Sequence, residues 1–224
     1  MIEQWLDRIM MTRVVLPRFR LFGVEIFLIM GLVLAWCGST AQAKVLAQAD
    51  FESGQVTEWT PFTTANGTFG GDGFPSVVDC DASGTGHSSK CWQVKVGQIQ
   101  YSPDQDPQQG GGLEIRQELP QGRLRLSAQI MVTYQSPNDK RNLAGGLLEW
   151  VVNDRVVGKL DMGPIENGAT LRHHLTADFP VVAGFHRIQL RLSRPFKSGT
   201  GQQAPVQSVD DLILDWSSPQ KDVP

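Results

Sequence analysis

Glu114 and Glu118 are the first residues whose types and spacing suggest chemistry, because two carboxylates can act as acid and base in glycoside hydrolysis. Four residues of extended strand would separate them by about 13 Å, whereas glycosidase carboxylates lie about 5–9.5 Å apart. The two cannot form such a pair with each other, although a partner on another strand is not excluded. Ion pairing with Arg123 and Arg125 across a hairpin is the favoured interpretation.

Other catalytic patterns find little support in the sequence. His173 and His174 are adjacent, so on a strand they point to opposite faces and cannot chelate one ion together. The chain has no H-E-x-x-H motif and no G-x-S-x-G elbow around a nucleophilic serine. We therefore expect a protein that is not an enzyme.

Asp210 is a candidate metal ligand. In the strand expected over residues 209–216 it shares a side with Leu212 and Leu214, which is the side expected to face the core. A buried carboxylate is costly unless it is paired or bound to a metal, and calcium prefers carboxylate and carbonyl oxygens. If the first and last strands are neighbours, Glu52 supplies a second carboxylate. Capping of backbone groups by Asp210, or pairing with an arginine, is the alternative.

Aromatic side chains offer a different kind of site, since they can stack on sugar rings. Trp150 and Trp216 lie within apolar strands and are expected in the core. The ligand-binding candidates are therefore Trp59, Trp92 and Tyr101, although Trp92 adjoins a cysteine and could pack on it instead.

Cys80 and Cys91 flank a stretch rich in glycine and serine and lie 11 residues apart. That spacing, without a C-x-x-C motif or further cysteines nearby, predicts a disulfide that staples a loop rather than a metal site.

The first 43 residues are predicted to be a signal peptide with an N-terminal helix. Arginines precede an uncharged run, Ile26–Trp36, and the segment ends in Ala41-Gln42-Ala43. The run has 11 residues, fewer than the roughly 20 that span a membrane, so cleavage after Ala43 is expected and an uncleaved anchor is the alternative. We therefore expect a secreted, periplasmic or envelope protein that meets a membrane only through this segment. A disulfide suits such a compartment.

Residues 44–224 are predicted to form a single domain. The whole chain has 224 residues and a formal net charge of −3, which argues against nucleic acid as a partner. Residues 123–134 alternate strictly between apolar and polar side chains, which is typical of a half-buried strand. Residues 113–119 alternate just before them, and a turn at residues 120–122 predicts a hairpin of the two. Many such short strands, with no helical periodicity after residue 43, predict an all-β antiparallel sandwich.

Two motifs near the ends of this region resemble galactose-binding-like jelly rolls, a group with many carbohydrate-binding modules and secreted bacterial members. The opening Asp50-Phe51-Glu52-Ser53-Gly54 with Trp59 is similar to their F-E-x-G…W pattern. The closing residues 209–214, V-D-D-L-I-L, resemble their last strand. The resemblance implies a jelly-roll fold and a structural Ca²⁺ held by Glu52 and Asp210, with Asp211 as a substitute ligand.

The sequence therefore favours an exported, non-catalytic module that binds an extracellular or envelope polysaccharide. A structural or protein-interaction subunit of an envelope assembly is the second hypothesis. A polysaccharide hydrolase or lyase is the third.

Overall fold

The computed structural model describes residues 43–56, 58–65, 67–71, 73–98, 108–195 and 204–219. Residues 1–42 of the predicted signal peptide and Tyr101 lie outside these residues. Within them no helix occurs, and hence none that could span a membrane. The described chain forms strands β1 (Lys44–Ala49), β2 (Thr60–Thr63), β3 (Gly67–Thr68), β4 (Ser76–Cys80), β5 (Ser89–Val94), β6 (Gly97–Gln98), β7 (Gln108–Leu119), β8 (Gly122–Thr133), β9 (Arg141–Asn142), β10 (Leu147–Val152), β11 (Arg155–Asp161), β12 (Ile165–Glu166), β13 (Thr170–Val181), β14 (Gly184–Pro195) and β15 (Val206–Ser217).

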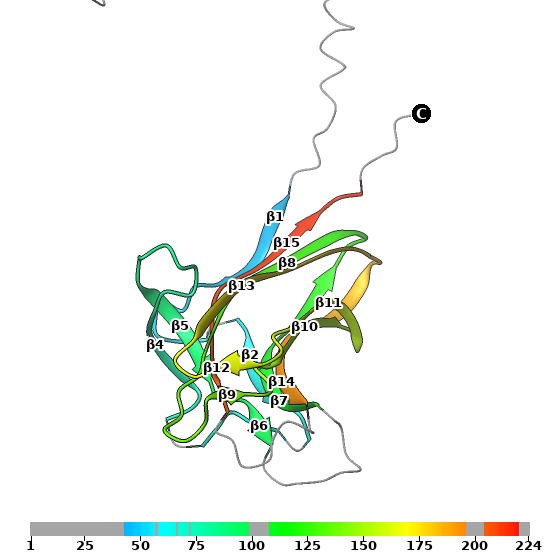
Figure 1. Ribbon diagram of the computed structural model, residues 1–224. Helices are drawn as coiled ribbons and strands as arrows, with labels where there is room; N and C mark the ends of the chain where they lie inside the picture. Colours follow the sequence, from blue (N-terminus) through cyan, green and yellow to red (C-terminus); the bar gives the residue numbers. More distant parts are fainter. Residues whose placement is uncertain are drawn as a thin grey trace, which may run out of the picture. The chain divides into compact units, whose positions relative to one another are not determined.

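Two antiparallel sheets pack face to face (Figure 1). Sheet A has the order β13-β8-β15-β5-β4, with β1 also paired to β15, and sheet B has the order β11-β10-β14-β7-β2. The pairs β9–β12 and β3–β6 are small additional sheets. The prediction of an all-β antiparallel sandwich of jelly-roll type is confirmed for the described residues.

Alternation along the strands builds the core between the sheets. Every second residue of β8, from Leu124 to Val132, is buried, as the sequence pattern predicts. From sheet B, Leu190 and Trp150 are fully buried against them. The indole nitrogen of Trp150 donates a hydrogen bond of 3.2 Å to the carbonyl oxygen of Leu175 on β13, so one side chain ties the two sheets together.

The predicted hairpin of residues 113–119 with residues 123–134 is wrong. β7 pairs with β14 and β2 in sheet B, whereas β8 pairs with β13 and β15 in sheet A. The turn at Pro120 and Gln121 therefore carries the chain from one sheet to the other. The alternation in sequence shows which side chains face the core. Strands of both sheets show the same alternation, so it cannot identify the partner strand.

The first and last strands are neighbours, as predicted. β15 pairs with β5 over Gln207–Val209 and with β1 over Leu212–Trp216, so β1 and β5 follow one another along the same edge of β15. Between the two stretches the register of β15 against β8 shifts at a bulge, where Asp211 has φ 47°. The bulge places Asp210 where one partner strand ends and the next begins.

Candidate functional site

The outer face of sheet B carries a cluster of polar side chains from three adjacent strands. β7, β14 and β10 lie side by side, and in each of them the side chains that do not enter the core project outward. We call this cluster the polar band; it consists of Glu114, Arg116, Glu149, Gln189 and Arg191.

Short hydrogen bonds between neighbouring strands fix the polar band. The guanidinium group of Arg191 donates to Glu149 Oε2 through Nη2 at 2.6 Å and through Nε at 3.0 Å. Gln189 Nε2 donates to Glu114 Oε2 at 2.7 Å, and Arg116 Nε donates to Glu114 Oε1 at 2.9 Å. Each carboxylate is therefore held by a cation or an amide before any ligand arrives.

The polar band is only partly open to solvent. The Glu149 side chain is 3% exposed and that of Arg191 is 23% exposed, whereas Arg116 is 73% exposed. A buried carboxylate with a guanidinium partner is rigid, because both groups would lose hydrogen bonds by moving apart. The band thus combines a buried inner part with an exposed cation at its edge.

Glycines lie beside the band in β7, where this strand pairs closely with β14. Gly112 of β7 lies opposite Arg191, and Gly110 lies opposite Ser193, which follows Arg191 on the same face of β14. A Cβ at Gly110 or Gly112 would approach a carbonyl oxygen of β14 to about 2 Å, so only glycine fits this closely paired stretch. The hydroxyl oxygen of Ser193 is buried and has no hydrogen-bond partner among the described residues. A buried hydroxyl without a partner is costly, so this face has unused hydrogen-bonding capacity.

The sequence did not predict this site as a unit. Glu114 and Glu118 were expected to pair with Arg123 and Arg125, but those two arginines pair instead with Asp178 of β13. This correction follows from the placement of β7 and β8 in different sheets. One feature of the sequence could have revealed the site: the polar residues 187, 189 and 191 alternate with apolar residues on a strand rich in arginine.

Trp59 and Trp92 cannot serve as a stacking platform, and that prediction is wrong. Each is 1% exposed and belongs to the core. The Trp59 ring packs against Trp150 at 6.2 Å between centroids, and Trp92 meets the edge of Phe69 at 5.4 Å. Burial of both indoles between the sheets leaves no ring face for a ligand. Tyr101 lies outside the described residues and stays a prediction.

His173 and His174 point to opposite faces of sheet A, as expected. His173 is aligned with the core residue Ile130, whereas His174 is aligned with Gln129 on the outer face. The described residues contain no group of three or more His, Cys, Asp or Glu side chains arranged to hold a metal ion.

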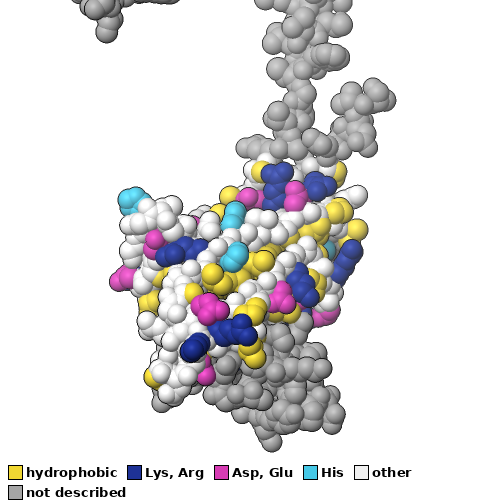
Figure 2. All heavy atoms as spheres, in the orientation of Figure 1, with side chains coloured by type: hydrophobic (Ala, Val, Ile, Leu, Met, Phe, Trp, Pro, Cys, Tyr) yellow, Lys and Arg dark blue, Asp and Glu magenta, His cyan; other side chains and the backbone are white. Residues whose placement is uncertain are grey.

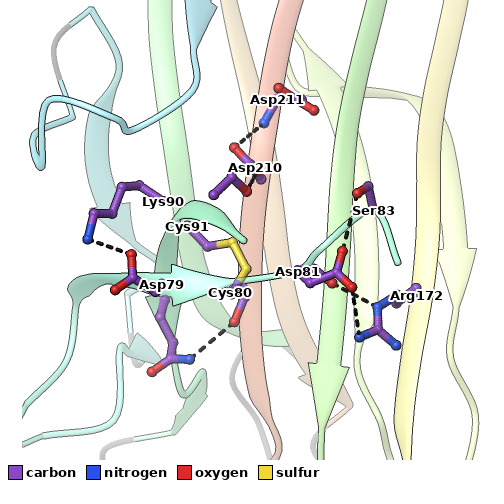
Figure 3. The surroundings of a disulfide bond; sticks show 12 residues. Asp79, Cys80, Asp81, Ser83, Lys90, Cys91, Arg172, Asp210 and Asp211 are labelled. Atoms are coloured by element: carbon purple, nitrogen blue, oxygen red, sulfur yellow. Dashed lines mark hydrogen bonds and ion pairs between the residues drawn. A yellow bond between two sulfur atoms is a disulfide. The ribbon is translucent and has the colours of Figure 1, made fainter. Parts of the chain in front are cut away.

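The predicted disulfide is present between Cys80 and Cys91, whose Cα atoms lie 5.9 Å apart. Figure 3 shows its surroundings. The bridge closes a loop in which the Asp81 carboxylate accepts hydrogen bonds from the backbone N–H groups of Gly84 and Gly86. Partial burial acts to raise the pKa of Asp81, but these bonds and the charge of Arg172 outweigh it, so the pKa lies below its ordinary value.

The loop between the cysteines packs on the outer face of sheet A. Cys80, Ala82 and Cys91 form a small second core with Met131 of β8. Arg172 of β13 donates to the carbonyl oxygen of Asp81 at 2.8 Å and fixes the loop from the other side. The disulfide therefore holds Ser89 and Lys90, which precede Cys91, at a defined place over β15.

Glu52 and Asp210 both contact that segment. Lys90 donates its backbone N–H to Glu52 Oε1 at 2.8 Å, and the Ser89 hydroxyl donates to Asp210 Oδ2. The backbone N–H of Asp211 donates to Asp210 Oδ1 at 2.7 Å. Asp210 is 4% exposed, while Asp211 is exposed.

Asp210 does not share a face with Leu212 and Leu214, contrary to expectation. Asp210 is aligned with Gln129 on the outer face, and the bulge that follows it returns Leu212 and Leu214 to the core. Its burial comes instead from the disulfide loop, through Ser89. Burial raises the pKa of Asp210, and the charges of Asp211 and Glu52 raise it further, against the opposing effect of the hydrogen bonds from Ser89 and Asp211.

Solved structures that resemble this chain include carbohydrate-binding modules. The second family 22 xylan-binding domain of Xyn10C from Paenibacillus barcinonensis has 14% identity and a TM-score of 0.42, with 75% of this chain and 98% of that chain covered. The N-terminal tandem of two family 22 domains of Xyn10C has 14% identity and a TM-score of 0.45, with 82% of this chain and 51% of that chain covered. TmCBM27, a module described by its specific mannan recognition, has 15% identity and a TM-score of 0.42, over 79% and 99%.

No protein-family model matches the sequence, and no curated protein matches it either. The assignment of the fold therefore rests on the strand pairing described above.

The raised pKa of Asp210 predicts how stability depends on pH when a chelator removes divalent cations. A carboxyl group with a folded-state pKa above its unfolded value opposes folding once the pH rises above that unfolded value. We expect Asp210→Asn, which retains an acceptor for Asp211 N–H and a donor for Ser89, to be more stable than the parent at pH 7. The advantage should shrink as the pH falls toward 4. Urea denaturation at both pH values measures the difference in free energy of unfolding between the variant and the parent. A difference that grows as the pH falls would contradict this prediction.

Proposed function

We propose that this chain is an exported, non-catalytic domain that binds polysaccharide at the polar band. The observation that carries the proposal is the pair of fixed contacts Arg191–Glu149 and Gln189–Glu114, side by side on three strands. Sugar hydroxyl groups both donate and accept hydrogen bonds. A surface that presents carboxylate, amide and guanidinium groups in one rigid array therefore suits them.

The Ser193 hydroxyl supports a binding surface rather than a purely structural network. It lies two residues beyond Arg191 on the same face of β14 and has no hydrogen-bond partner among the described residues. A network that served stability alone would be expected to satisfy that hydroxyl.

The arrangement of the two glutamates favours binding over hydrolysis. One strand lies between β7 and β10, so Glu114 and Glu149 do not lie on adjacent strands, and each carboxylate is bonded to its own partners on β7 or β14. Each glutamate also forms a hydrogen-bonded ion pair with an arginine, which engages a carboxylate oxygen that a reacting group would need.

The place of action that we propose is the cell envelope or the exterior. The leader pattern, with cleavage after Ala43, and a disulfide between the two cysteines of the domain both suit an oxidising compartment. The ligand would be an extracellular or envelope polysaccharide.

Substitution of Arg191 by Ala should weaken polysaccharide binding by about tenfold or more, because it removes a charged donor and leaves the Glu149 carboxylate buried without a cation. Glu149→Gln should have a similar effect. Affinity electrophoresis and calorimetry against a panel that includes xylan and mannan measure this. Arg123→Ala is the matched control, since Arg123 makes an exposed ion pair in the other sheet.

Equal polysaccharide affinity of the Arg191 and Arg123 variants would contradict the proposal that the polar band is the binding site. No retention on any polysaccharide, together with capture of one stoichiometric protein partner, would favour the structural or protein-interaction alternative. Release of reducing ends by the purified chain, lost in Glu114→Gln, would favour a hydrolase.

We further propose that Glu52 and Asp210, with Asp211 beside them, hold a structural Ca²⁺. Asp210 is a buried carboxylate with no ion pair to a basic side chain in the described part of the chain, and the charge of Glu52 reaches it. A divalent cation would offset both charges and the cost of burial. Carboxylates alone do not complete such a site here, so backbone carbonyl oxygens would supply the remaining ligands.

Calcium should raise the melting temperature of the parent protein, and a chelator should lower it, because an ion that binds only the folded state stabilises it. Asp210→Asn should remove this sensitivity. Asp139→Asn is the matched control, since Asp139 is a partly buried carboxylate elsewhere in the domain that bonds to Tyr134 and Ser136. Scanning calorimetry with and without chelator measures the effect. A melting temperature of the parent protein that the chelator does not change would contradict the metal site.

A further inference from the structure

A recess of about 500 Å³ lies on the outer face of sheet A, at the end where β15 begins. Thr170 of β13 is aligned with Thr133 of β8, and Thr133 is aligned with Val206 of β15. Continuing the antiparallel register of β15 with β5 by one residue sets Lys95 beside Val206. Val132, which precedes Thr133, is a core residue, so this row faces outward. The row crosses four strand positions over about 14 Å, and the recess has the size of a ligand pocket.

Two loops flank the recess and are held in fixed positions. Asn167 Oδ1 accepts the backbone N–H of Ser136 at 2.8 Å, and Asn167 Nδ2 donates to the carbonyl oxygen of Ser136 at 2.8 Å. The backbone N–H of Gly168 donates to the carbonyl oxygen of Tyr134 at 2.8 Å. Gln135 and Gly168 also line a second recess of about 450 Å³, which continues from the first. The surface is thus formed before a ligand arrives, which lowers the entropic cost of binding.

The lining of the recess is polar and carries a single charge. Thr133 and Thr170 contribute hydroxyl groups, Gln135 an amide and Lys95 an ammonium group. No carboxylate lines either recess in the part of the chain that the structure describes. Hydroxyl and amide groups both donate and accept hydrogen bonds, whereas an ammonium group only donates. A matching ligand therefore carries hydroxyl groups and one negative charge.

Lys95 has no counter-ion. Its side chain is partly buried and forms neither a hydrogen bond nor an ion pair with any residue that the structure describes. Other basic groups of sheet A are paired: Lys90 with Asp79, and Arg172 with Asp81. Figure 2 shows basic and acidic side chains next to one another on one face of the molecule. An anion can bind the Lys95 ammonium without first displacing a carboxylate of the protein.

We propose that this recess binds a hexuronate unit of an acidic polysaccharide, with the carboxylate on Lys95 Nζ and the ring hydroxyl groups on Thr133, Thr170 and Gln135. One ammonium matches one carboxylate, and a charge-assisted hydrogen bond between them is stronger than a neutral one. The inference goes beyond the proposed function, because it names an acidic ligand and a second site. That site lies on the other sheet and uses none of the residues of the polar band.

Calorimetric titration of the full chain with pentagalacturonate and with its methyl ester tests the proposal, because the ester removes the charge and keeps the sugar. Lys95→Met should weaken pentagalacturonate binding by about tenfold or more and leave ester binding unchanged. Thr170→Val, which keeps the shape and removes the hydroxyl, should weaken it by several-fold. Lys44→Met is the matched control, since Lys44 is an exposed lysine of β1 at the opposite end of sheet A.

Absence of pentagalacturonate binding, or equal affinity of the parent for the acid and its ester, overturns the proposal. An equal loss of affinity in Lys95→Met and Lys44→Met also overturns it. Displacement of the sugar by an equal concentration of inorganic phosphate would assign the recess to any small anion and would contradict it as well. An unchanged melting temperature of Lys95→Met shows that this variant is folded. Arg191→Ala should retain pentagalacturonate binding, which separates failure of this inference from failure of the proposed function.

Discussion

The packing of Leu190, Trp150 and their neighbours against the inner face of β8 is the constraint on which the rest of the structure depends. Because successive side chains on a strand point to opposite faces, burying one set between the sheets fixes the orientation of the other set. Arg191 and Gln189 face outward because Leu190 faces inward. The core therefore positions the polar band, and the hydrogen bond from Trp150 to Leu175 fixes the two sheets to one another.

A second constraint is the shared edge of β15. Its first half pairs with β5 and its second half with β1, and the bulge between them turns Asp210 outward beneath Ser89. The disulfide holds Ser89 and Lys90 there through Cys91. Glu52 and Asp210, from opposite ends of the domain sequence, thus contact the same segment next to Cys91. Burial and the charge of Glu52 therefore both raise the pKa of Asp210.

Local pattern predicted much of the fold. The alternation in residues 123–134 and the bridge between Cys80 and Cys91 each depend on nearby residues, and each is present. The partner of β7 was not predictable in this way, because alternation identifies a buried face but not the strand that lies beside it. Gly110 and Gly112 lie in β7, where close pairing with β14 requires glycine.

The candidate site was harder to predict than the fold. Glu114, Glu149 and Arg191 are far apart in sequence and meet only because β7, β14 and β10 are neighbours. Trp59 and Trp92 looked suited to sugar rings by residue type, but the large apolar area of an indole also favours the core, and burial prevailed. Asp210 was recognised as a buried carboxylate, although the bulge that places it on the outer face leaves no clear mark in the sequence.

Mapping of a bound oligosaccharide by NMR tests the central claim most directly. The isotopically labelled protein is titrated with xylo- and manno-oligosaccharides, and the shifts of the backbone amides are followed. The account predicts that the largest shifts fall on Gly112, Gln189, Arg191 and Glu149, on the outer face of sheet B. Shifts confined to the outer face of sheet A, or no shifts with any oligosaccharide of the panel, would contradict it.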